Sequence, residues 1–488
     1  MAANRAPFHV PHFLQPPTTE LSHFLLGDNQ LQIVNGCNPS YKKGVLIKDL
    51  GYSKVGSTIQ SGKSITGLHH FHQTAATQKI LATVNNSGDT AMQLFYGTGG
   101  AWTELTDAET AWSGYEDSLV EMEDFIGYCF FVGYDSTDAV FLPNRTLTDT
   151  TFGTTLTTSM PGARYIKRYR DRLYVANCYN AAAQPYRVYF SSVPSAGSIS
   201  WTVASDFFDV DYSESITGIE TNWDRFVIFT DYSAYFYDQD SKKKVWDVGC
   251  SQHRSIQNIG QYMIWANKDT VLVSNGGGFP VPIGGDIQEL IRQSSSSKWQ
   301  SAVVDREYVL YLGATSANGL SYTNCMATYN VDSGMWRWRE LADGITALAR
   351  VTTSGKDFLY MGANDGDVHV KAKYTDMTPI TADNGTAIKS HFRTKAYDFG
   401  DPSILKKVIK TVAYAESGLG LVLYYRLFDK KQEGLQEFKK IGVLDKVINE
   451  FTSGIEGYFI QFEGREMSGR APWRFHGLTA LFGPDSRL

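Results

Sequence analysis

The stretch that decides the fold runs from residue 162 to residue 256. It opens GARYIKRYRDRLYVANCYN (162–180), continues through YRVYFSSVPSAGSISWTV (186–203) and ITGIETNWDRFVIFTDYSAYFYD (216–238), and ends GCSQHRSI (249–256). Short runs of Tyr, Val, Phe and Ile alternate with polar residues and are interrupted by Asn, Asp, Ser, Pro and Gly. This alternation is typical of half-buried antiparallel strands joined by tight turns.

The same pattern occurs twice within this stretch. The pair Asp-Arg stands at 171–172 and again at 224–225, each time just before a short apolar strand. Each of these strands is followed by a polar turn and a second strand that is rich in Tyr. A spacing of about fifty residues between two such units is typical of a repeat architecture.

Seven stretches of the chain begin and develop alike. They start near Ile65, Tyr115, Gly162, Ile216, Gln257, Ser301 and Ile345. Spacings of roughly 40 to 50 residues leave room for four strands each, as in the blades of a propeller. We therefore predict an all-β fold with a β-propeller of six or seven blades over residues 19–376. Aromatic residues at repeated blade positions are expected to be buried between the sheets: Tyr174, Trp201, Phe229, Trp265, Tyr308 and Trp336.

Two segments depart from the repeat. Past Asp376 the alternating strands become longer, which predicts an antiparallel β-sandwich-like domain over residues 377–488. Before it, GGDIQELIRQ (284–293) places three apolar side chains on one helical face. This predicts a short helix on a blade connection, with Asp286 as its N-cap.

Residues 1–18 form a Pro-rich arm that cannot build a core by itself. Its apolar side chains, Phe8, Val10, Phe13 and Leu14, need cover from the body or from a neighbouring subunit. We expect the arm to leave its own fold and pack on a neighbouring subunit or an adaptor. A disordered terminus is the alternative interpretation.

Composition narrows the class further. The chain has 488 residues with 28 Tyr, 27 Phe and 44 Gly, which favours strands and turns over helices. A net charge of −6 shows no overall basic character for nucleic acid. The five cysteines stand singly and are odd in number, so we expect buried thiols in a reducing compartment. No apolar run is long enough to span a membrane, and the N-terminus lacks the apolar core of a secretion signal.

Several segments carry a family resemblance: RDRLYVAN, YRVYFSS, ISW, GCSQHRSI, MIWANKDTVLVS, YNVDSGMWRWREL and KSHFRTKAYDFGDPSILKKV. From about Gly36 to Phe482, the chain resembles the tail hub or nozzle proteins of short-tailed bacteriophages, also called packaged-DNA stabilisation proteins. At WANKDT, Thr270 stands where a Gly is expected after the Asp, which leaves the turn type there open.

The resemblance implies a virion tail protein that is assembled in the host bacterial cytoplasm. It implies a ring, commonly of six copies, below the portal and its adaptor protein. Tail fibre, spike or needle proteins would dock on it, and genomic DNA would pass through its lumen without sequence-specific binding. The family offers no catalytic residue to carry over.

Candidate chemical motifs mostly fail. GSTIQSGKS (56–64) imitates a phosphate-binding loop, but the spacing is one residue too long and no helix follows. The cluster His69, His70 and His72 could offer two imidazoles on one strand face, yet no carboxylate or Cys is close in sequence. Asn364–Asp367 has alternating oxygen ligands but lacks the bidentate Glu of a calcium loop, so a hairpin turn is expected there.

Two charged runs remain. Glu121, Glu123 and Asp124 could serve a glycosidase, but acids beside a strand are most often a solvated face. Lys242, Lys243 and Lys244 read as a solvated hairpin tip, with an intersubunit or DNA-facing patch as the functional alternative. Together with these failed motifs, the resemblance implies a non-enzymatic virion structural protein without cofactor or metal. The alternative is a carbohydrate-binding or glycan-processing propeller.

Overall fold

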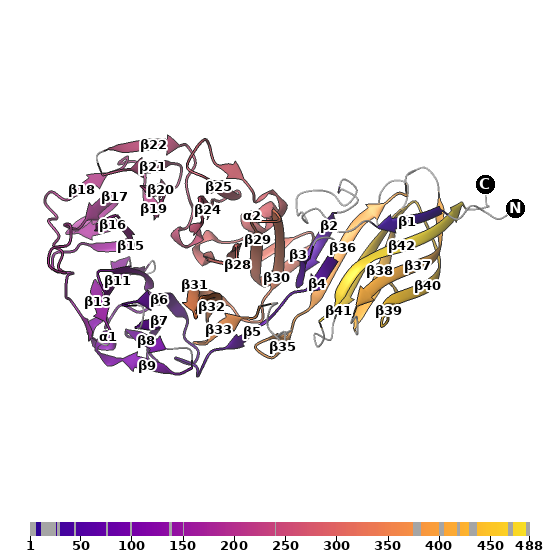
Figure 1. The fold of residues 1–488 in the computed structure, drawn as a ribbon, viewed down its shortest axis with the longest axis horizontal. Coiled ribbons are helices and arrows are strands. Elements are labelled where there is room, and N and C mark those ends of the chain that lie inside the picture. Colours follow the sequence, from indigo (N-terminus) through magenta and orange to yellow (C-terminus); the bar gives the residue numbers. More distant parts are fainter. Residues whose placement is uncertain are drawn as a thin grey trace.

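Small antiparallel sheets stand side by side around a ring, and a longer pair of sheets extends from one side of it (Figure 1). The computed structural model describes residues 6–10, 26, 30–42, 45–74, 77–97, 100–135, 139–149, 151–239, 241–373, 382–399, 405–416, 420–428, 437–466 and 472–484. Among these residues the ring has seven blades, numbered here in chain order. The prediction of a β-propeller with six or seven blades is confirmed.

Blades 1 to 4 each contain a run of antiparallel strands. Blade 1 is β6 (Ile65–His72), β7 (Gln78–Asn85), β8 (Met92–Gly97) and β9 (Trp102–Leu105); blade 2 is β10 (Leu119–Phe125), β11 (Tyr128–Asp135), β13 (Arg145–Thr148) and β14 (Thr151–Gly153), with β12 (Val140–Phe141) beside β11. Blade 3 is β15 (Gly162–Tyr169), β16 (Arg172–Asn180), β17 (Ala182–Phe190) and β18 (Phe207–Asp209); blade 4 is β19 (Ile216–Asn222), β20 (Arg225–Thr230), β21 (Ala234–Tyr237) and β22 (Lys242–Trp246).

Blades 5 to 7 complete the ring. Blade 5 is β23 (Gln257–Ile259), β24 (Tyr262–Ala266), β25 (Val271–Ser274) and β26 (Val281–Pro282); blade 6 is β27 (Gln300–Val304), β28 (Glu307–Ala317), β29 (Leu320–Asn330) and β30 (Met335–Glu340). Blade 7 is β31 (Ile345–Thr353), β32 (Lys356–Ala363), β33 (Val368–Lys371) and, from before blade 1, β5 (Tyr52–Lys54). Because β5 joins blade 7 and β31 packs beside β6, the first and last blades are tied together.

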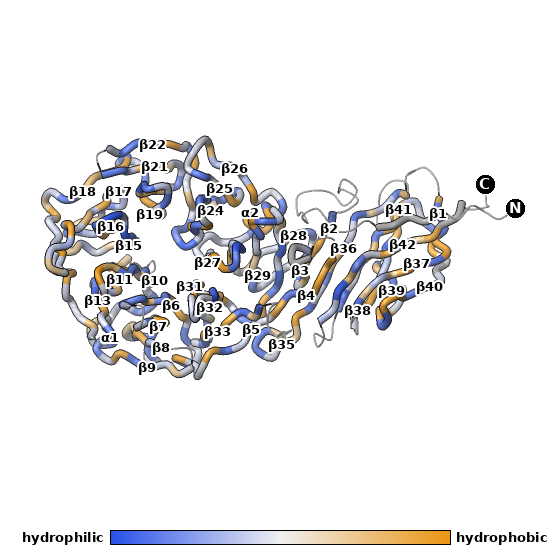
Figure 2. The backbone as a smooth tube through the Cα atoms, viewed as in Figure 1, coloured by the Kyte–Doolittle hydropathy of each residue, from blue (hydrophilic) through white to orange (hydrophobic). Residues whose placement is uncertain are grey.

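The blade cores lie between neighbouring sheets. Figure 2 shows hydrophobic and hydrophilic residues interspersed around the ring. Phe229 of blade 4 and Trp265 of blade 5, for example, have ring centroids 5.0 Å apart. All six aromatic residues that the sequence analysis expected in the core are buried: Tyr174, Trp201, Phe229, Trp265, Tyr308 and Trp336.

A β-sandwich adjoins the ring, as predicted. One sheet contains β1 (Ala6–Val10), β3 (Cys37–Lys42), β4 (Val45–Lys48), β42 (Arg474–Pro484), β37 (Lys406–Glu416) and β40 (Ile448–Gly457). The other contains β2 (Leu31–Asn35), β36 (Ser390–Tyr397), β41 (Phe459–Glu466), β38 (Leu421–Phe428) and β39 (Lys439–Leu444). Two short strands, β34 (Ala382–Asp383) and β35 (Thr386–Ala387), extend the sheet of blade 7.

The two parts share one sheet. β2 pairs in parallel with β30 of blade 6 at Asn35 and Trp338, so blade 6 and the second sandwich sheet form a continuous nine-stranded sheet. This corrects the predicted boundary at residue 19, because β2, β3 and β4 belong to the sandwich sheets and not to the propeller. The physical reason is that these early strands pair with the edges of sheets formed by residues far away in the sequence. The position of a strand in the sequence does not indicate such a partner.

The N-terminal arm also differs from its prediction. β1 pairs antiparallel with the chain's own β42, from Ala6 opposite Phe482 to Val10 opposite Leu478. An open sheet edge offers hydrogen-bond partners to the backbone N–H and C=O groups of an extended segment. Pro7 is tolerated in this strand because an edge strand need not donate a backbone hydrogen bond at every position. Phe8 and Val10 therefore lie on a strand of the sandwich, whereas Phe13 and Leu14 fall outside the described residues.

Short helices occupy blade connections. The expected helix is present as η2 (Gly285–Ile287) and α2 (Gln288–Gln293), with Leu290 buried, but Asp286 makes no capping hydrogen bond, so that detail was wrong. Burial instead raises the pKa of Asp286 to about 7. A second helix, α1 (Thr106–Ala111), was not predicted; η1 (His253–Ser255) and η3 (Ser296–Lys298) are single turns.

Candidate functional site

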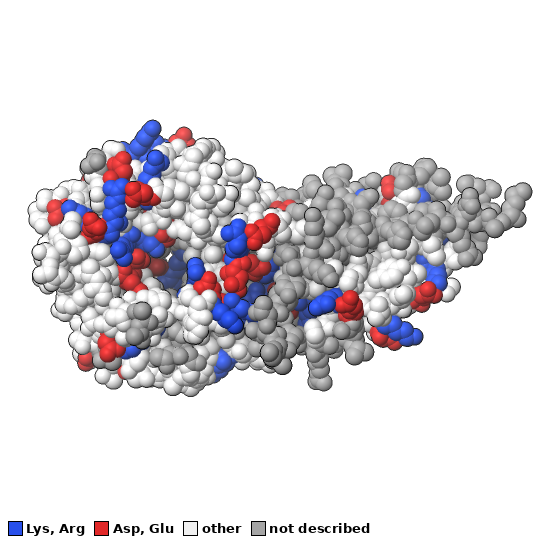
Figure 3. Space-filling model, in the orientation of Figure 1, with Lys and Arg blue, Asp and Glu red and all other residues white. Residues whose placement is uncertain are grey.

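The seven innermost strands surround a cavity of about 190 Å³ on the propeller axis. Basic and acidic side chains gather around the hollow in the middle of the ring (Figure 3). Every blade contributes to the lining, which includes Leu68, His69, Glu121, Glu123, Lys167, Glu220, His253, Arg254, Gln300 and Leu348. The axis is therefore a polar site enclosed by apolar blade cores.

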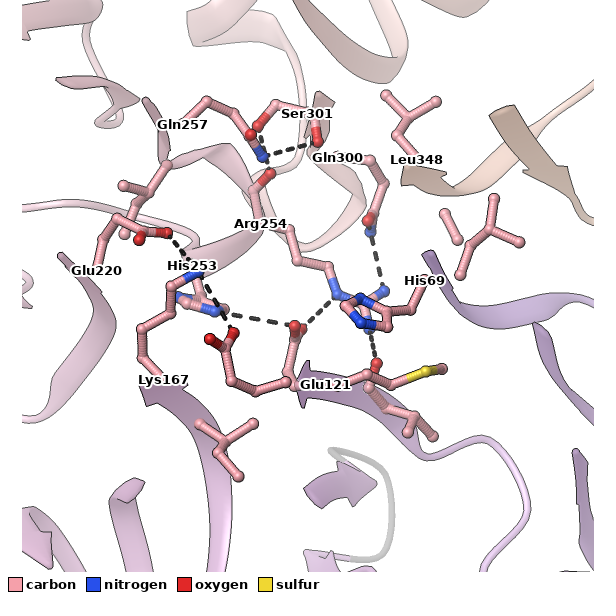
Figure 4. Close-up of a pocket in the computed structure, with 17 residues that line it drawn as sticks. His69, Glu121, Lys167, Glu220, His253, Arg254, Gln257, Gln300, Ser301 and Leu348 are labelled. Carbon is pink, nitrogen blue, oxygen red and sulfur yellow. Dashed lines mark hydrogen bonds and ion pairs between the residues drawn. The ribbon is translucent and has the colours of Figure 1, made fainter. Parts of the chain in front are cut away.

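Arg254 reaches across this cavity from η1, just before blade 5, to blade 2 (Figure 4). Its Nε lies 2.6 Å from Glu121 Oε1. One terminal nitrogen donates to the backbone oxygens of Thr66 and Val120 at 2.9 and 2.8 Å. The other donates to Gln300 Oε1 at 3.4 Å. The guanidinium thus ties blades 1, 2 and 6 to the segment that precedes blade 5.

Lys167 of blade 3 lies between two carboxylates. Its Nζ is 3.2 Å from Glu220 of blade 4 and 3.5 Å from Glu123 of blade 2. Burial by itself lowers the pKa of Lys167, but the two carboxylates outweigh burial, and the net shift is upward. Lys167 is therefore a permanent cation of the cavity.

The two glutamates of β10 have pKa values that move in opposite directions. Burial raises the pKa of both side chains. For Glu121, the charges of Arg254 and His253 outweigh burial, so the pKa lies below its usual range. For Glu123, burial together with Glu220 prevails over Lys167, so the pKa lies above its usual range.

The sequence analysis expected these acids on a solvated face, and that expectation was wrong. Glu121 and Glu123 line the axial cavity, and Asp124 accepts from His69 Nε2 and from the backbone N–H of His72, both at 2.8 Å. Both faces of an inner propeller strand are enclosed by neighbouring blades, so a polar side chain there finds partners instead of bulk water.

The histidine cluster divides between two environments. His70 and His72 share a face, with ring centroids 4.0 Å apart, as expected for a strand. His70 Nδ1 accepts the backbone N–H of Thr352, and burial lowers its pKa to about 4. The fold brings Asp124 and Cys129 to His69, which the sequence could not indicate.

The remaining candidates lie away from the axis. Lys242, Lys243 and Lys244 are exposed on β22, the outer strand of blade 4. Lys244 pairs with Asp247 at 2.9 Å, and Lys242 donates to the backbone oxygen of Asp209. The loop 56–64 connects β5 to strand β6, so no helix follows to hold a phosphate.

None of the helices in the described part of the chain is long and apolar enough to cross a membrane.

No protein-family model matches the chain, and no curated protein matches it in sequence. Solved structures that are similar to part of this chain include the following two. BBS1N, in a complex with ARL6DN, is 10% identical with a TM-score of 0.41, covering 68% of this chain and 100% of its own. The Pan2 WD40 domain of Neurospora crassa is 7% identical with a TM-score of 0.42, covering 68% and 97%.

Proposed function

We propose that this protein is a non-enzymatic structural subunit of a bacteriophage tail. In this proposal, copies of the chain form a ring that extends the DNA exit channel below the portal and adaptor, helps retain packaged DNA and docks tail fibres or spikes. The observation that carries the proposal is the continuous nine-stranded sheet from β27 to β39, which joins propeller and sandwich as one β-structure. β2 and β30 meet in this sheet at Asn35 and Trp338, and β3 also packs against β30, which suits a rigid structural part.

The axial cavity supports the same proposal. Its volume of about 190 Å³ is below the roughly 300–1,000 Å³ typical of small-molecule sites. Its charged side chains are engaged with one another, as Arg254 is with Glu121. DNA therefore has no path through a single propeller. The proposed channel is the central opening of the oligomer, which neighbouring subunits surround. The exposed lysines of β22 are available for contacts between subunits or with passing DNA.

Imaging of the purified full-length chain and of virions tests the proposal. We expect negative-stain electron microscopy to show closed rings, and mass photometry to give about six times the mass of one chain. Labelled antibody should decorate the tail of purified particles. A chain that stays monomeric at all concentrations and is absent from particles would overturn the proposal.

A glycan-processing propeller is the second candidate, and one observation favours it. Glu121 and Glu123 lie on one strand of the axial cavity with pKa values shifted apart, as an acid and a carboxylate partner would require. Each, however, already has a cationic partner, Arg254 or Lys167. Release of reducing sugar from host glycans that is abolished by Glu123→Gln would favour this candidate over the structural role.

A further inference from the structure

A second polar cluster lies where the ring closes, in blade 7. The turn between β32 and β33 holds Asp365 and Asp367, and β33 carries His369. A ring nitrogen of His369 and one carboxylate oxygen from each aspartate all lie within 4.8 Å of one another. Asp365 is the most exposed of the three.

His369 has an unusual environment. It is 0% exposed, and neither ring nitrogen hydrogen-bonds to any residue that the structure describes. Its Nε2 lies 3.3 Å from Asp343 Oδ2, without the geometry of a hydrogen bond. Buried polar groups are normally satisfied, so a buried imidazole with two unsatisfied nitrogens indicates a missing partner.

The turn is held in position by the loop that precedes β6. The backbone N–H groups of Ile59 and Gly62 donate to the oxygens of Gly366 and Asp365, both at 2.9 Å. Gly366 has φ +88°, and a Cβ there would lie 1.8 Å from Gln60 O, so this position requires glycine. The carboxylates at the turn are therefore placed by a fixed backbone.

The charges of the cluster do not balance. Asp343, Asp365 and Asp367 supply three carboxylates, and Lys54 of β5 supplies one ammonium, 2.7 Å from Asp367 Oδ1. Three negative charges against one positive charge leave two formal negative charges for a divalent cation to neutralise.

We propose that Asp365, Asp367 and His369 bind a divalent transition-metal ion of the Zn²⁺ type. One imidazole with carboxylates suits Zn²⁺, whereas Ca²⁺ and Mg²⁺ prefer all-oxygen sites. The candidate ligand atoms lie within 4.8 Å of one another and would close to about 3.3 Å around a tetrahedral Zn²⁺. Asp343 supplies a further carboxylate beside the imidazole.

The bound ion would stabilise the contact that closes the propeller between blade 7 and β5. His369 stands opposite Lys54 in the pairing of β33 with β5, the strand that ties blade 7 to the start of the propeller. An ion bound only by the folded chain raises its stability by mass action. This inference concerns one chain and does not depend on the proposed role in a phage tail.

The cluster of His69, Asp124 and Cys129 offers a comparison. There the carboxylate oxygens of Asp124 accept from His69 and from the backbone N–H of His72. The carboxylate of Asp124 is thus already engaged by hydrogen bonds, so the His69 cluster is the control location.

Titration of the full chain with ZnCl₂, after removal of bound metal with EDTA and dialysis, tests the proposal. We expect isothermal titration calorimetry to show about one Zn²⁺ per chain, with a higher melting temperature in its presence and much weaker binding of Ca²⁺ and Mg²⁺. Asp365→Asn and His369→Gln should each weaken binding at least tenfold. The side chain of Asp365 is more exposed than that of His369, so Asp365→Asn should still fold. The test therefore remains decisive even if His369→Gln does not fold.

Two control variants carry substitutions outside the proposed metal site. Asp269→Asn makes the same change in the β24–β25 turn, where the side chain is 73% exposed, and should bind Zn²⁺ like the unaltered chain. His69→Gln should do the same. Absence of stoichiometric binding, wild-type affinity in Asp365→Asn, or loss of binding only in His69→Gln would overturn the proposal.

Discussion

Arg254 Nε lies 2.6 Å from Glu121 Oε1, and this contact spans the propeller axis from the segment before blade 5 to the inner strand of blade 2. The two residues are 133 positions apart in sequence. Because the same guanidinium also donates to backbone oxygens of blades 1 and 2, its loss would affect several blades together. The side chains on the axis therefore hold several blades together, in addition to lining the candidate site.

Substituting Arg254 by alanine should destabilise the chain strongly. The change leaves Glu121 without its main counter-charge in a site where its side chain is only 21% exposed. Removing one partner of a buried pair typically costs about 3–5 kcal/mol. Urea denaturation followed by tryptophan fluorescence would measure the loss.

Arg306→Ala is the matched control for this experiment. Arg306 pairs with Asp332 at 2.7 Å, but both side chains are more than half exposed. Exposed pairs contribute about 0–1 kcal/mol, so this variant should unfold almost like the unaltered chain. Equal costs for the two variants would contradict a structural role of the axial pair.

The sandwich should lose stability in acid through Glu463. Burial by itself raises the pKa of this carboxyl, but His391 and Arg393 outweigh burial and lower it from its ordinary 4.5 to about 2. Because the pKa is lower in the folded chain than in the unfolded chain, the stabilisation is complete above about pH 4.5. It is lost as the pH falls toward 2, and amounts to on the order of 3 kcal/mol.

Unfolding midpoints measured between about pH 6 and pH 3 would check this dependence. Glu463→Gln should lower stability at neutral pH and flatten the acid limb of the profile. Glu450→Gln is the control, because Glu450 is 55% exposed in its pair with Lys410. A Glu463→Gln profile as steep as that of the unaltered chain would contradict the assignment.

Much of the propeller could be predicted because each blade is a local unit. Five blades begin at the predicted residue, and blades 2 and 6 begin at Leu119 and Gln300 instead of near Tyr115 and Ser301. Strand alternation and turn residues act over short distances, so the sequence displays them directly. Strands that pair across hundreds of residues, such as β5 with β33 and β2 with β36, leave no such local signal.

The site could be predicted only in part, for a related reason. Periodicity identifies an inner strand, but it does not show which side chain from a distant blade will face it. Glu121 was therefore assigned to solvent although Arg254 covers it. The hairpin turn predicted at Asn364–Asp367 is present between β32 and β33, but the prediction did not show that His369 lies beside it. Asp365 and Asp367 lie in the turn before β33, whereas His369 lies on the strand, so strand periodicity did not indicate this cluster.

The blade cores should depend on their buried aromatic side chains. Trp265 is 0% exposed and donates its indole N–H to Gly249 O at 3.1 Å. Trp265→Ala should cost about 3–5 kcal/mol, as large core truncations do. Phe279→Ala, at a residue 65% exposed, should cost little. Thermal melts of both variants would decide, and a mild effect at Trp265 would contradict the packing described for blades 4 and 5.

The thiols should be inert in the folded chain. All five cysteines are free and buried, and burial raises the pKa of Cys250 to about 12. Because the thiolate is the reactive form, a thiol reagent should label the native chain very slowly and all five positions after denaturation. The melting temperature should not change with reductant. Rapid native labelling, or a loss of several degrees with reductant, would contradict this expectation.

The N-terminal strand should protect the sandwich edge. β1 covers β42 from Leu478 to Phe482, next to the part of β42 that β4 covers at Phe475. Deleting residues 1–10 would leave that edge with unpaired backbone groups, which favour pairing with another chain. We expect a lower melting temperature and more self-association by light scattering, whereas deletion of residues 1–5 alone should have no effect. If both truncations behave like the full chain, β1 contributes nothing to its own sandwich, and the apolar arm is available to a neighbouring subunit as the sequence analysis expected.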